Sequence, residues 1–335
     1  MHGYLSDAEH ATCFHDLLST ATETAFEPYE SFYGDTARIA QLSPGSFAGK
    51  VLSADVGRFC VRLERCNQVV EKEVSCGSDM LVFNVCADKN RPRLSYNGMT
   101  DETDWVLVQP PNAKSVLISP ASSIQLTVEV SYQFLLQQLD SMPEICDWIK
   151  RLKKNGEFLR SNLVANRLRD IGRLALECSQ REPWLEKLHL VESNLVLGLV
   201  TGLTLSWLPH KDFETYRRPS ALSHFQSARR LLLQRHDALT GTDPRKVADL
   251  GSRRTIEKAF SELIDMGPVM YARILRLNRA RRKIQDGAYF DRSIGDIAAE
   301  EGFWDWSRFT SYYRKQFGEL PSETRSSQER MKACA

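Results

Sequence analysis

A chain of 335 residues with 42% hydrophobic residues is long enough for two or three domains with ordinary cores. The formal net charge of +1 is unevenly distributed: residues 221–335 carry 21 Lys+Arg against 15 Asp+Glu, whereas residues 1–220 carry 23 against 28. The basic C-terminal part is therefore the candidate for binding a polyanion such as nucleic acid, and the acidic front is not, although a merely solvated basic surface would have the same charge.

The cysteines and the apolar runs argue against a disulfide-stabilised protein and against a membrane-spanning protein. The chain has 8 cysteines but no CxxC pair, and no charged and then apolar leader opens it. We therefore expect reduced thiols in the cytoplasm rather than a disulfide framework. The longest apolar run, Leu195 to Leu208, is broken by Thr and Ser and is shorter than the ~20 residues of a membrane span. A buried helix is predicted there, and no membrane association.

Residues 1–130 are predicted to form a β-rich domain. After a short helix near His10–Ala21, residues 46–130 alternate short runs of Val, Leu, Ile and Phe with turn residues. Asn97-Gly98 is a strong hairpin signal, and Pro110-Pro111-Asn112 marks another turn. Short strands at this spacing favour a small sandwich or barrel. The clearest runs are Phe59–Leu63, Met80–Val85, Trp105–Val108, Ser115–Ile118 and Ile124–Val130.

Metal ligands and reactive thiols are few in the strand region. None of the seven histidines falls within residues 46–130, so a histidine-liganded metal centre, and with it a barrel enzyme, is not expected. Four cysteines do fall there and could bind metal or sense oxidation, although free cysteine is more often a small buried hydrophobe. A thiol-based redox-sensing regulator therefore stays open as an alternative. The four are Cys60, Cys66, Cys76 and Cys86.

Residues 131–218 are predicted to be helical. Tyr132–Leu139 is amphipathic, and a second helix begins at Pro143, a residue suited to a first helical position. Glu157–Cys178 and Pro183–Leu208 continue the helical pattern. The apolar stripes of these helices must be covered, either within the chain or in a homodimer. We interpret the segment as a helical linker whose role in dimerisation stays open.

Beyond a hinge at residues 217–220, residues 221–328 are predicted to form an all-α domain. Asp243-Pro244 opens a helix that ends at Gly251, and Ser252 caps the next helix. Gly267-Pro268 then starts a long connecting helix that ends near Asp286 and is rich in arginine. The helix after Ser252 has one apolar row, formed by Ile256, Phe260 and Ile264.

A second unit repeats this plan. Ser293 and Asp296 resemble a capping box, Gly302 supplies a left-handed turn residue, and Asp305 can cap the following helix. That helix has a buried row of Phe309, Tyr313 and Phe317. Its opposite row can enter a major groove and meet base edges and thymine methyl groups, although an ordinary surface helix would look similar. The opposite row is Trp306, Ser307, Thr310, Ser311 and Arg314.

These C-terminal residues resemble the AraC/XylS-type transcriptional regulators. The run from Gly267 to Arg281 is similar to that family's GxSPxxYxxxxRLxxAR segment. Residues 297–325 are similar to its IAxxxGFxxxSxFxxxFxxxxGxxPxxxR signature, through Ile297-Ala, Gly302-Phe303 and the residues that follow. The front half resembles, more weakly, the cupin-like barrels that serve this family as sensor domains, with Trp105-Val-Leu-Val-Gln-Pro-Pro111 in place of a related turn.

The resemblance implies an α+β chain: an N-terminal β-rich cupin-like barrel, a helical linker, and two helix-turn-helix subdomains joined by a long helix. It also implies DNA contacts. In the first unit they are Arg254, Glu257 and Lys258, with Arg253 and Thr255 on the DNA backbone. In the second they are Trp306, Ser307, Arg308, Thr310 and Ser311.

Two departures from the family pattern stand out. Gly251 runs directly into Ser252, one residue short of the usual turn, which would rotate the first recognition helix. Trp304 and Trp306 occupy positions where polar residues are commoner.

The predicted function is that of a sequence-specific regulator of transcription, an activator rather than an enzyme. Its expected partners are double-stranded DNA, RNA polymerase and a small-molecule effector bound in the barrel or at its junction with the helices, with no cofactor and no metal. The apolar strands weakly favour a neutral or apolar effector. Such an effector acts only if it prefers one arrangement of the domains over another.

Overall fold

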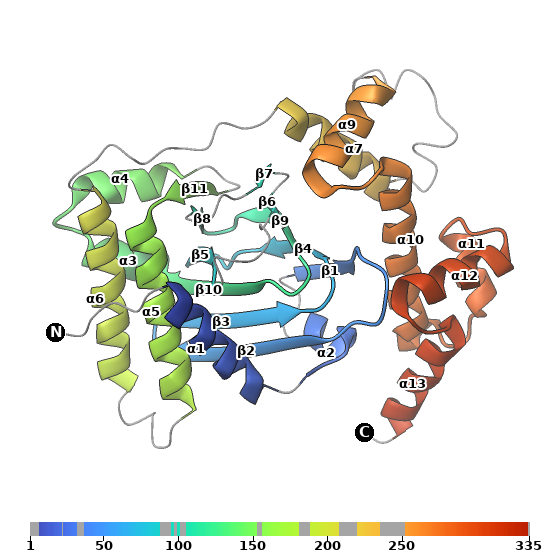
Figure 1. Cartoon of the computed structure of the whole chain (residues 1–335), viewed down its shortest axis with the longest axis horizontal. Helices are drawn as coiled ribbons and strands as arrows, with labels where there is room; N and C mark the ends of the chain where they lie inside the picture. The colour runs from blue at the N-terminus through green and yellow to red at the C-terminus, as the bar shows by residue number, and fades with distance from the viewer. Residues whose placement is uncertain are drawn as a thin grey trace.

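The computed structural model describes residues 7–21, 23–31, 37–87, 95–96, 99–100, 105–152, 156–180, 188–207, 220–234 and 252–333. It has a β-rich N-terminal part, helices that cover this part on one side, and a helical C-terminal part (Figure 1). The predicted α+β class is therefore confirmed. The helix predicted over 243–251 and most of the hinge at 217–220 lie outside the described residues.

The strands include all five predicted runs, but β1 lies in residues 1–45, where no strand is predicted. They are β1 (Ala37–Gln41), β2 (Gly49–Val56), β3 (Phe59–Cys66), β4 (Val70–Ser75), β5 (Met80–Cys86), β6 (Ser95–Tyr96), β7 (Met99–Thr100), β8 (Trp105–Gln109), β9 (Lys114–Ser119), β10 (Ile124–Ser131) and β11 (Glu157–Arg160). The predicted hairpin is present, because β6 pairs antiparallel with β7. Its turn, Asn97-Gly98, lies outside the described residues. Asn112 has a φ of 60° in its turn, a conformation that asparagine tolerates better than most residues.

Two antiparallel sheets result. Sheet A has the order β11-β8-β5-β10-β3-β2, and sheet B has the order β1-β4-β9-β6-β7. The sheets face one another, since Trp105, Leu107 and Phe158 of sheet A form one apolar cluster with Leu117 of sheet B. Strand β1 lies at one edge of sheet B and pairs only with β4 there.

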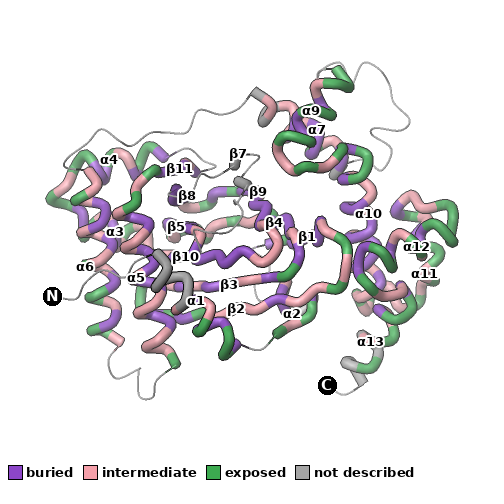
Figure 2. The backbone as a smooth tube through the Cα atoms, in the orientation of Figure 1, coloured by how far each residue is buried: buried purple, intermediate pink, exposed green. Residues whose placement is uncertain are grey.

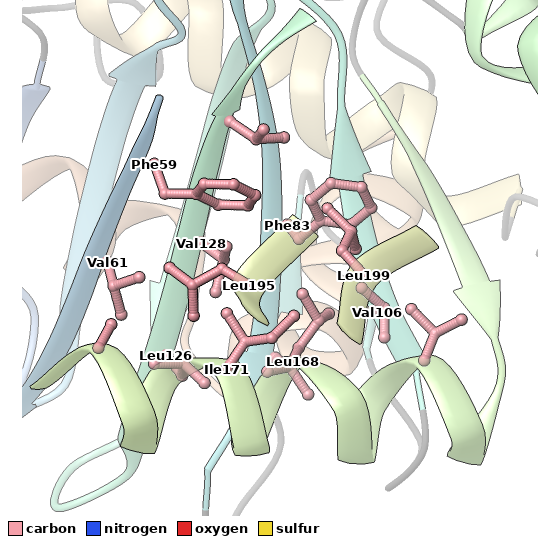
Figure 3. Packing of buried hydrophobic residues seen from close by; sticks show 14 of the residues in the cluster. Phe59, Val61, Phe83, Val106, Leu126, Val128, Leu168, Ile171, Leu195 and Leu199 are labelled. Atoms are coloured by element: carbon pink, nitrogen blue, oxygen red, sulfur yellow. The ribbon is translucent and has the colours of Figure 1, made fainter. Parts of the chain in front are cut away.

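The main hydrophobic core lies on the other face of sheet A, beneath helices α1 (Asp7–Thr20), α5 (Asn162–Ser179) and α6 (Leu188–Trp207). Figure 3 shows Val61, Leu126 and Val128 of the sheet packed against Leu168 and Leu195 of the helices. Alternate residues of each strand point to this face, so the apolar runs that identify the strands supply the contacts to the helices. The apolar stripes of these helices are therefore covered within the chain, by sheet A, which is one of the two possibilities predicted.

One predicted helix begins later than expected. The helical pattern was extended back to Glu157, but Glu157–Arg160 forms β11, which pairs antiparallel with β8 at the edge of sheet A. Phe158 and Leu159 are both buried there, one on each face of the strand. Helix α5 starts after Ser161, whose side chain accepts a hydrogen bond from the backbone N–H of Val164. Pairing with an open sheet edge overrode the local helical pattern.

Helix α6 is apolar on nearly all sides, and only one side is buried. Leu195, Leu199 and Leu203 are buried, whereas Leu197 is 65% exposed. By length and composition the helix could cross a membrane, but a helix that packs in a protein core passes the same test. The prediction of a buried helix is therefore correct for one face and wrong for the other, where Leu190 and Leu205 are also exposed.

The remaining helices complete the two parts of the molecule. Those next to the sheets are α2 (Phe26–Ser31), α3 (Tyr132–Gln138) and α4 (Pro143–Arg151), the last with proline at its first position as predicted. The C-terminal part contains α7 (Ser220–Gln234), α9 (Arg253–Ile264), α10 (Pro268–Gln285), a 3-10 turn (Gly287–Tyr289), α11 (Ile294–Glu300), α12 (Trp306–Phe317) and α13 (Pro321–Ala333).

Candidate nucleic-acid interface

The second helix-turn-helix unit, α11 and α12, is built from the local signals that the sequence displays. The hydroxyl of Ser293 accepts a hydrogen bond from the N–H of Asp296 at 3.0 Å and donates one to its carboxylate at 2.6 Å. Gly302 has a φ of +80° in the turn, where a side chain would be strained. The carboxylate of Asp305 caps α12 by accepting from the N–H of Arg308 at 3.0 Å. These caps fix where both helices begin.

Helix α12 has one fully buried row. Phe309, Tyr313 and Phe317 pack in a cluster of their own with Ile297 and Ala298 of α11 and with the C-terminal half of α10. The rings are in direct contact, with centroids 5.6 Å apart for Phe309–Tyr313 and 4.7 Å apart for Tyr313–Phe317. This row holds the helix by its inner face and leaves the outer face without cover from the described residues.

The outer face of α12 forms a shallow hollow of about 640 Å³. The predicted contact residues Trp306, Ser307, Thr310 and Ser311 line it, together with Arg314. The ring of Trp306 is 52% exposed and that of Trp304 is 86% exposed. The hydroxyl of Thr310 has no hydrogen-bond partner in the part of the chain that the structure describes. Two further lining residues, Lys315 and Leu320, are not among the predicted contacts. Leu320 reaches the hollow only because the chain turns back after α12.

Helix α9, the predicted reader of the first unit, has the same two-faced design. Ser252 caps it by accepting from the N–H of Thr255 at 3.1 Å, and Ile256 and Phe260 are buried. The predicted contact residues are all exposed: Arg253, Arg254, Glu257 and Lys258. Arg253 pairs with Glu257 at 2.9 Å, and Lys258 pairs with Glu262 at 3.5 Å. Exposed pairs of this kind are weak and can give way to another partner.

The arginine-rich connecting helix α10 is not a second basic surface. Arg279 pairs with Glu301 at 2.8 Å, Arg281 pairs with Glu319 at 2.9 Å, and Lys283 also pairs with Glu301 at 2.8 Å. Arg273 stacks over the ring of Tyr312. These cations hold the second unit onto α10. The exposed cations of the described C-terminal part lie largely on the two reader helices instead, at Arg253, Arg254, Lys258, Arg308, Arg314 and Lys315.

Comparison with known proteins agrees with this geometry. A family model described as a helix-turn-helix domain matches residues 251–327. The XylDLEGF operon transcriptional activator of Pseudomonas putida is 37% identical over 73 residues, covering 22% of this chain and 23% of that protein. The HTH-type transcriptional regulator ArgR of Pseudomonas aeruginosa is 37% identical over 75 residues, covering 22% of each chain. The chain therefore spans less than a quarter of the length of these curated relatives.

Residues 251–327 therefore form a helix-turn-helix domain similar to those of these transcriptional regulators. Solved structures with a similar arrangement include the AraC-like transcriptional activator CuxR, at 12% identity and a TM-score of 0.39, covering 77% of this chain and 94% of that one. A structure of ToxT from Vibrio cholerae has 12% identity and a TM-score of 0.26, covering 86% of this chain and 96% of that one.

The C-terminal helical part is docked on the edge strand of sheet B. The side-chain amide of Asn278 on α10 accepts from the backbone N–H of Gln41 at 2.9 Å and donates to its carbonyl at 3.0 Å. The same carbonyl accepts a hydrogen bond from the side chain of Gln316 on α12 at 2.9 Å. The open edge of β1 is thereby satisfied by side chains from the connecting helix and from the second reader helix.

A buried ionic cluster joins the next strand to the first unit. Glu71 of β4 accepts from the guanidinium of Arg229 on α7 at 2.6 Å and from the hydroxyl of Tyr271 on α10. All three side chains are buried. Burial lowers the pKa of Arg229, but the charge and hydrogen bond of Glu71 together with Tyr271 and Glu73 outweigh burial and raise it, so the arginine stays charged. Burial raises the pKa of Tyr271, so its hydroxyl stays protonated and donates.

The space between the two sheets is a polar cavity of about 300 Å³. Its charged and amide lining includes Arg62, Glu64, Lys72, Asn84, Gln109 and Glu129, with Val74, Val82 and Leu117 as apolar neighbours. The neutral or apolar effector stays a prediction. Most apolar residues of sheet A belong to the core under the helices, and β5 and β10 are buried along most of their length (Figure 2).

The cysteines of the strand region do not have the properties of reactive thiols. Burial raises the pKa of Cys60 and of Cys76 to about 12, and that of Cys66 to about 11. A reactive or sensing cysteine needs its thiolate form near neutral pH. These three thiols are protonated there, which weighs against the redox-sensing alternative.

Proposed function

We propose that this protein is a sequence-specific regulator that binds double-stranded DNA with α9 and α12. The observation that carries the proposal is the exposed row of α12, which lines a hollow opposite a fully buried aromatic row. Helix α10 connects the two units and has 18 residues. At ~1.5 Å per residue it is about 27 Å long. This length is close to the ~34 Å that separates successive major grooves on one face of DNA.

The contact residues divide into two roles. We assign base contacts to Arg254, Glu257 and Lys258 of α9 and to Trp306, Ser307, Arg308, Thr310 and Ser311 of α12. We assign phosphate contacts to Arg253 and Thr255 at the N-terminus of α9, where backbone N–H groups also favour an anion. All of these side chains except Thr255 and Thr310 are exposed, which supports the assignment. Thr310 is half-buried and its hydroxyl oxygen is buried, so its assignment rests on its place in the lining of the hollow.

Selection of binding sites from a random DNA pool, followed by titration at several salt concentrations, tests both roles. Thr310→Ala or Ser311→Ala should weaken binding to the selected site by about 1–3 kcal/mol and relax one base position. Arg253→Ala should weaken binding to all sequences and reduce the salt slope by about one unit. Ser326→Ala, on the exposed side of α13, is the matched control. Site preferences unchanged by every reader variant would refute the base contacts.

We propose further that the protein activates transcription by engaging RNA polymerase at promoters in the cytoplasm. The similarity of residues 251–327 to a helix-turn-helix domain and to activators of Pseudomonas putida supports this role. Transcription in vitro with purified RNA polymerase, from a template carrying the selected site, should rise when the protein is added. A fall in transcript would make the protein a repressor.

The front of the chain is proposed to be the control region, with residues 1–130 as a sensor, 131–218 as a helical linker and 221–328 as the DNA-binding domain. Strand β4 supports this division. Its Lys72 lines the polar cavity, and its neighbour Glu71 points the other way, to Arg229 and Tyr271 of the first unit. An effector in the cavity would therefore act on a strand that holds the DNA-binding domain directly.

A homodimer is proposed through the exposed leucine row of α6. Leu190, Leu197 and Leu205 are 53%, 65% and 45% exposed, and exposed apolar rows of this kind mark protein contacts. Sedimentation at micromolar concentration should show a dimer for the natural chain and a monomer for Leu197→Glu. A natural chain that sediments as a monomer would remove the proposal.

A further inference from the structure

The two faces of sheet A are built from opposite kinds of residue. The face under the helices is apolar, whereas the face toward sheet B buries charged and amide side chains: Glu64, Asn84, Gln109 and Gln125, opposite Lys72 of sheet B. Burying a charge is unfavourable unless it is paired, and apolar residues of similar size are often more stable. A space that binds a polar ligand would explain why this domain keeps buried polar side chains despite their unfavourable free energy of burial. This reasoning rests on the proposed sensor role of the N-terminal domain.

One part of the cavity wall is already complete. Lys72 is bonded to Glu64, which also accepts from the hydroxyl of Tyr29 at 2.9 Å. Next to this group, Thr127 donates to Asn84 at 2.8 Å, Asn84 donates to Gln109 at 2.7 Å, and Gln109 donates to Ser115 at 2.8 Å. Thr127–Asn84 and Asn84–Gln109 join neighbouring strands of sheet A, whereas Gln109–Ser115 and Lys72–Glu64 join the two sheets. These side chains are held in place by one another, so they form a fixed polar wall rather than the point of ligand attachment.

The other part of the wall is more accessible. Arg62 and Glu129 stand on neighbouring strands with a nitrogen–oxygen distance of 3.5 Å, and their side chains are 18% and 23% exposed, against 2% and 8% for Lys72 and Glu64. Desolvation raises the pKa of Glu129, and the charge of Arg62 opposes this shift. This part of the wall therefore offers a cation and an anion side by side.

We propose that this cavity binds a small zwitterion of the α-amino acid class, whose carboxylate pairs with Arg62 and whose ammonium group pairs with Glu129. Such a ligand presents an anion to Arg62 and a cation to Glu129 and brings no net charge into the interior. A simple carboxylate would have to compete with Glu129 for Arg62. A simple amine would have to compete with Arg62 for Glu129. The apolar neighbours Val74, Val82 and Leu117 are placed to contact the ligand's side chain.

Calorimetric titration of the full-length protein tests the ligand class. The probes are the twenty common L-α-amino acids, with benzoate, hexylamine and glucose as single-function comparisons. At least one amino acid should bind more than tenfold tighter than every comparison compound. The methyl ester and the N-acetyl derivative of that amino acid each lack one charge and should each bind at least tenfold more weakly. These probes need no variant of the protein.

Two matched variants locate the site. Glu129→Gln keeps the size of the side chain, removes its charge, and should reduce the affinity for the amino acid at least tenfold. Glu73→Gln, a half-exposed residue on the opposite face of β4, should leave the affinity unchanged. Should Glu129→Gln fail to fold, the ester and N-acetyl series on the natural chain still decides the question.

Several outcomes would overturn the proposal. Tighter binding of glucose or benzoate than of any amino acid would give the cavity a different ligand class, and binding unaffected by Glu129→Gln would move the site elsewhere. Binding of none of the amino acids would also refute it. Sequence-specific DNA binding, measured on the same preparation, separates this failure from a failure of the proposed function, since the DNA contacts lie in α9 and α12 and not in the cavity.

Discussion

The two helix-turn-helix units differ in where their hydrophobic cores end. In the second unit, Phe309, Tyr313 and Phe317 form a cluster with apolar residues of α10, α11 and the adjoining turn, and no residue of either sheet belongs to that cluster among the described residues. In the first unit, Phe225, Phe260 and Tyr271 form one cluster with Ala40 and Ile118 of sheet B and with Leu42, which follows β1. Helix α9 therefore shares its core with the N-terminal β-rich part, and α12 does not. A shift of β1 or β9 would reach α9 through packed side chains.

The second unit is attached to the sensor mainly through polar groups and one close backbone contact. The carbonyl of Gln316 accepts from the N–H of Gly45 at 3.0 Å and from the side chain of Gln41 at 2.9 Å. Gly318 ends α12 with a φ of +76°, and a Cβ there would lie 2.9 Å from the backbone nitrogen of Ser46. If the two parts of the molecule separate, these hydrogen bonds can be replaced by hydrogen bonds to water. Separating the first unit would instead expose apolar side chains to water, which is unfavourable.

The largest expected effect comes from truncating one aromatic residue in each unit. Phe225→Ala and Phe309→Ala should each destabilise their own cluster by about 3–5 kcal/mol. Phe225→Ala should also speed hydrogen exchange in β1 and β9, because its cluster includes Ala40 and Ile118. Phe309→Ala should affect α11, α12 and the C-terminal half of α10 but not the strands. Exchange in β1 and β9 that rises equally in both variants would abolish the distinction between the units.

A somewhat smaller effect is expected from breaking the buried ionic cluster. Arg229→Met leaves Glu71 buried with only Tyr271 as partner and should cost about 3 kcal/mol, the lower end of what losing one member of a buried pair costs. Limited proteolysis should then release the first unit from the sensor. Glu73→Gln is the control, since Glu73 is half exposed and 3.7 Å from Arg229. A stable, undigested Arg229→Met protein would show that packing alone holds the first unit.

The smallest effect concerns the helix caps, which should be alike in the two units. Ser252→Ala and Asp305→Ala each remove a side-chain acceptor from the first turn of a reader helix and should each cost about 1 kcal/mol. Hydrogen exchange of the first turn of each helix measures this. The two costs should agree within a factor of about two because capping is local. A much larger cost for Ser252→Ala would mean that the cap also supports the contact with the sensor.

The sequence predicted the second unit in nearly every local detail. Ser293, Gly302 and Asp305 each act through groups a few residues away, so their roles can be read without knowing the fold. The strands were predicted for a similar reason, because runs such as Ile124–Val130 carry their own β preference. The error at Glu157–Arg160 has the opposite cause. That segment is a strand because β8 lies beside it, a neighbour about fifty residues away in the chain.

Sequence alone thus determined the elements, their caps, and the buried and exposed rows of the reader helices, because these depend on spacings of a few residues. Only the tertiary structure decided what the strands face. The apolar residues of sheet A turn to the helices, and the polar ones close on a cavity. It alone brought Glu71 to Arg229 and Gln41 to Asn278, pairs separated by 158 and 237 residues. Such contacts follow from the packing of whole sheets and helices, which no local pattern specifies.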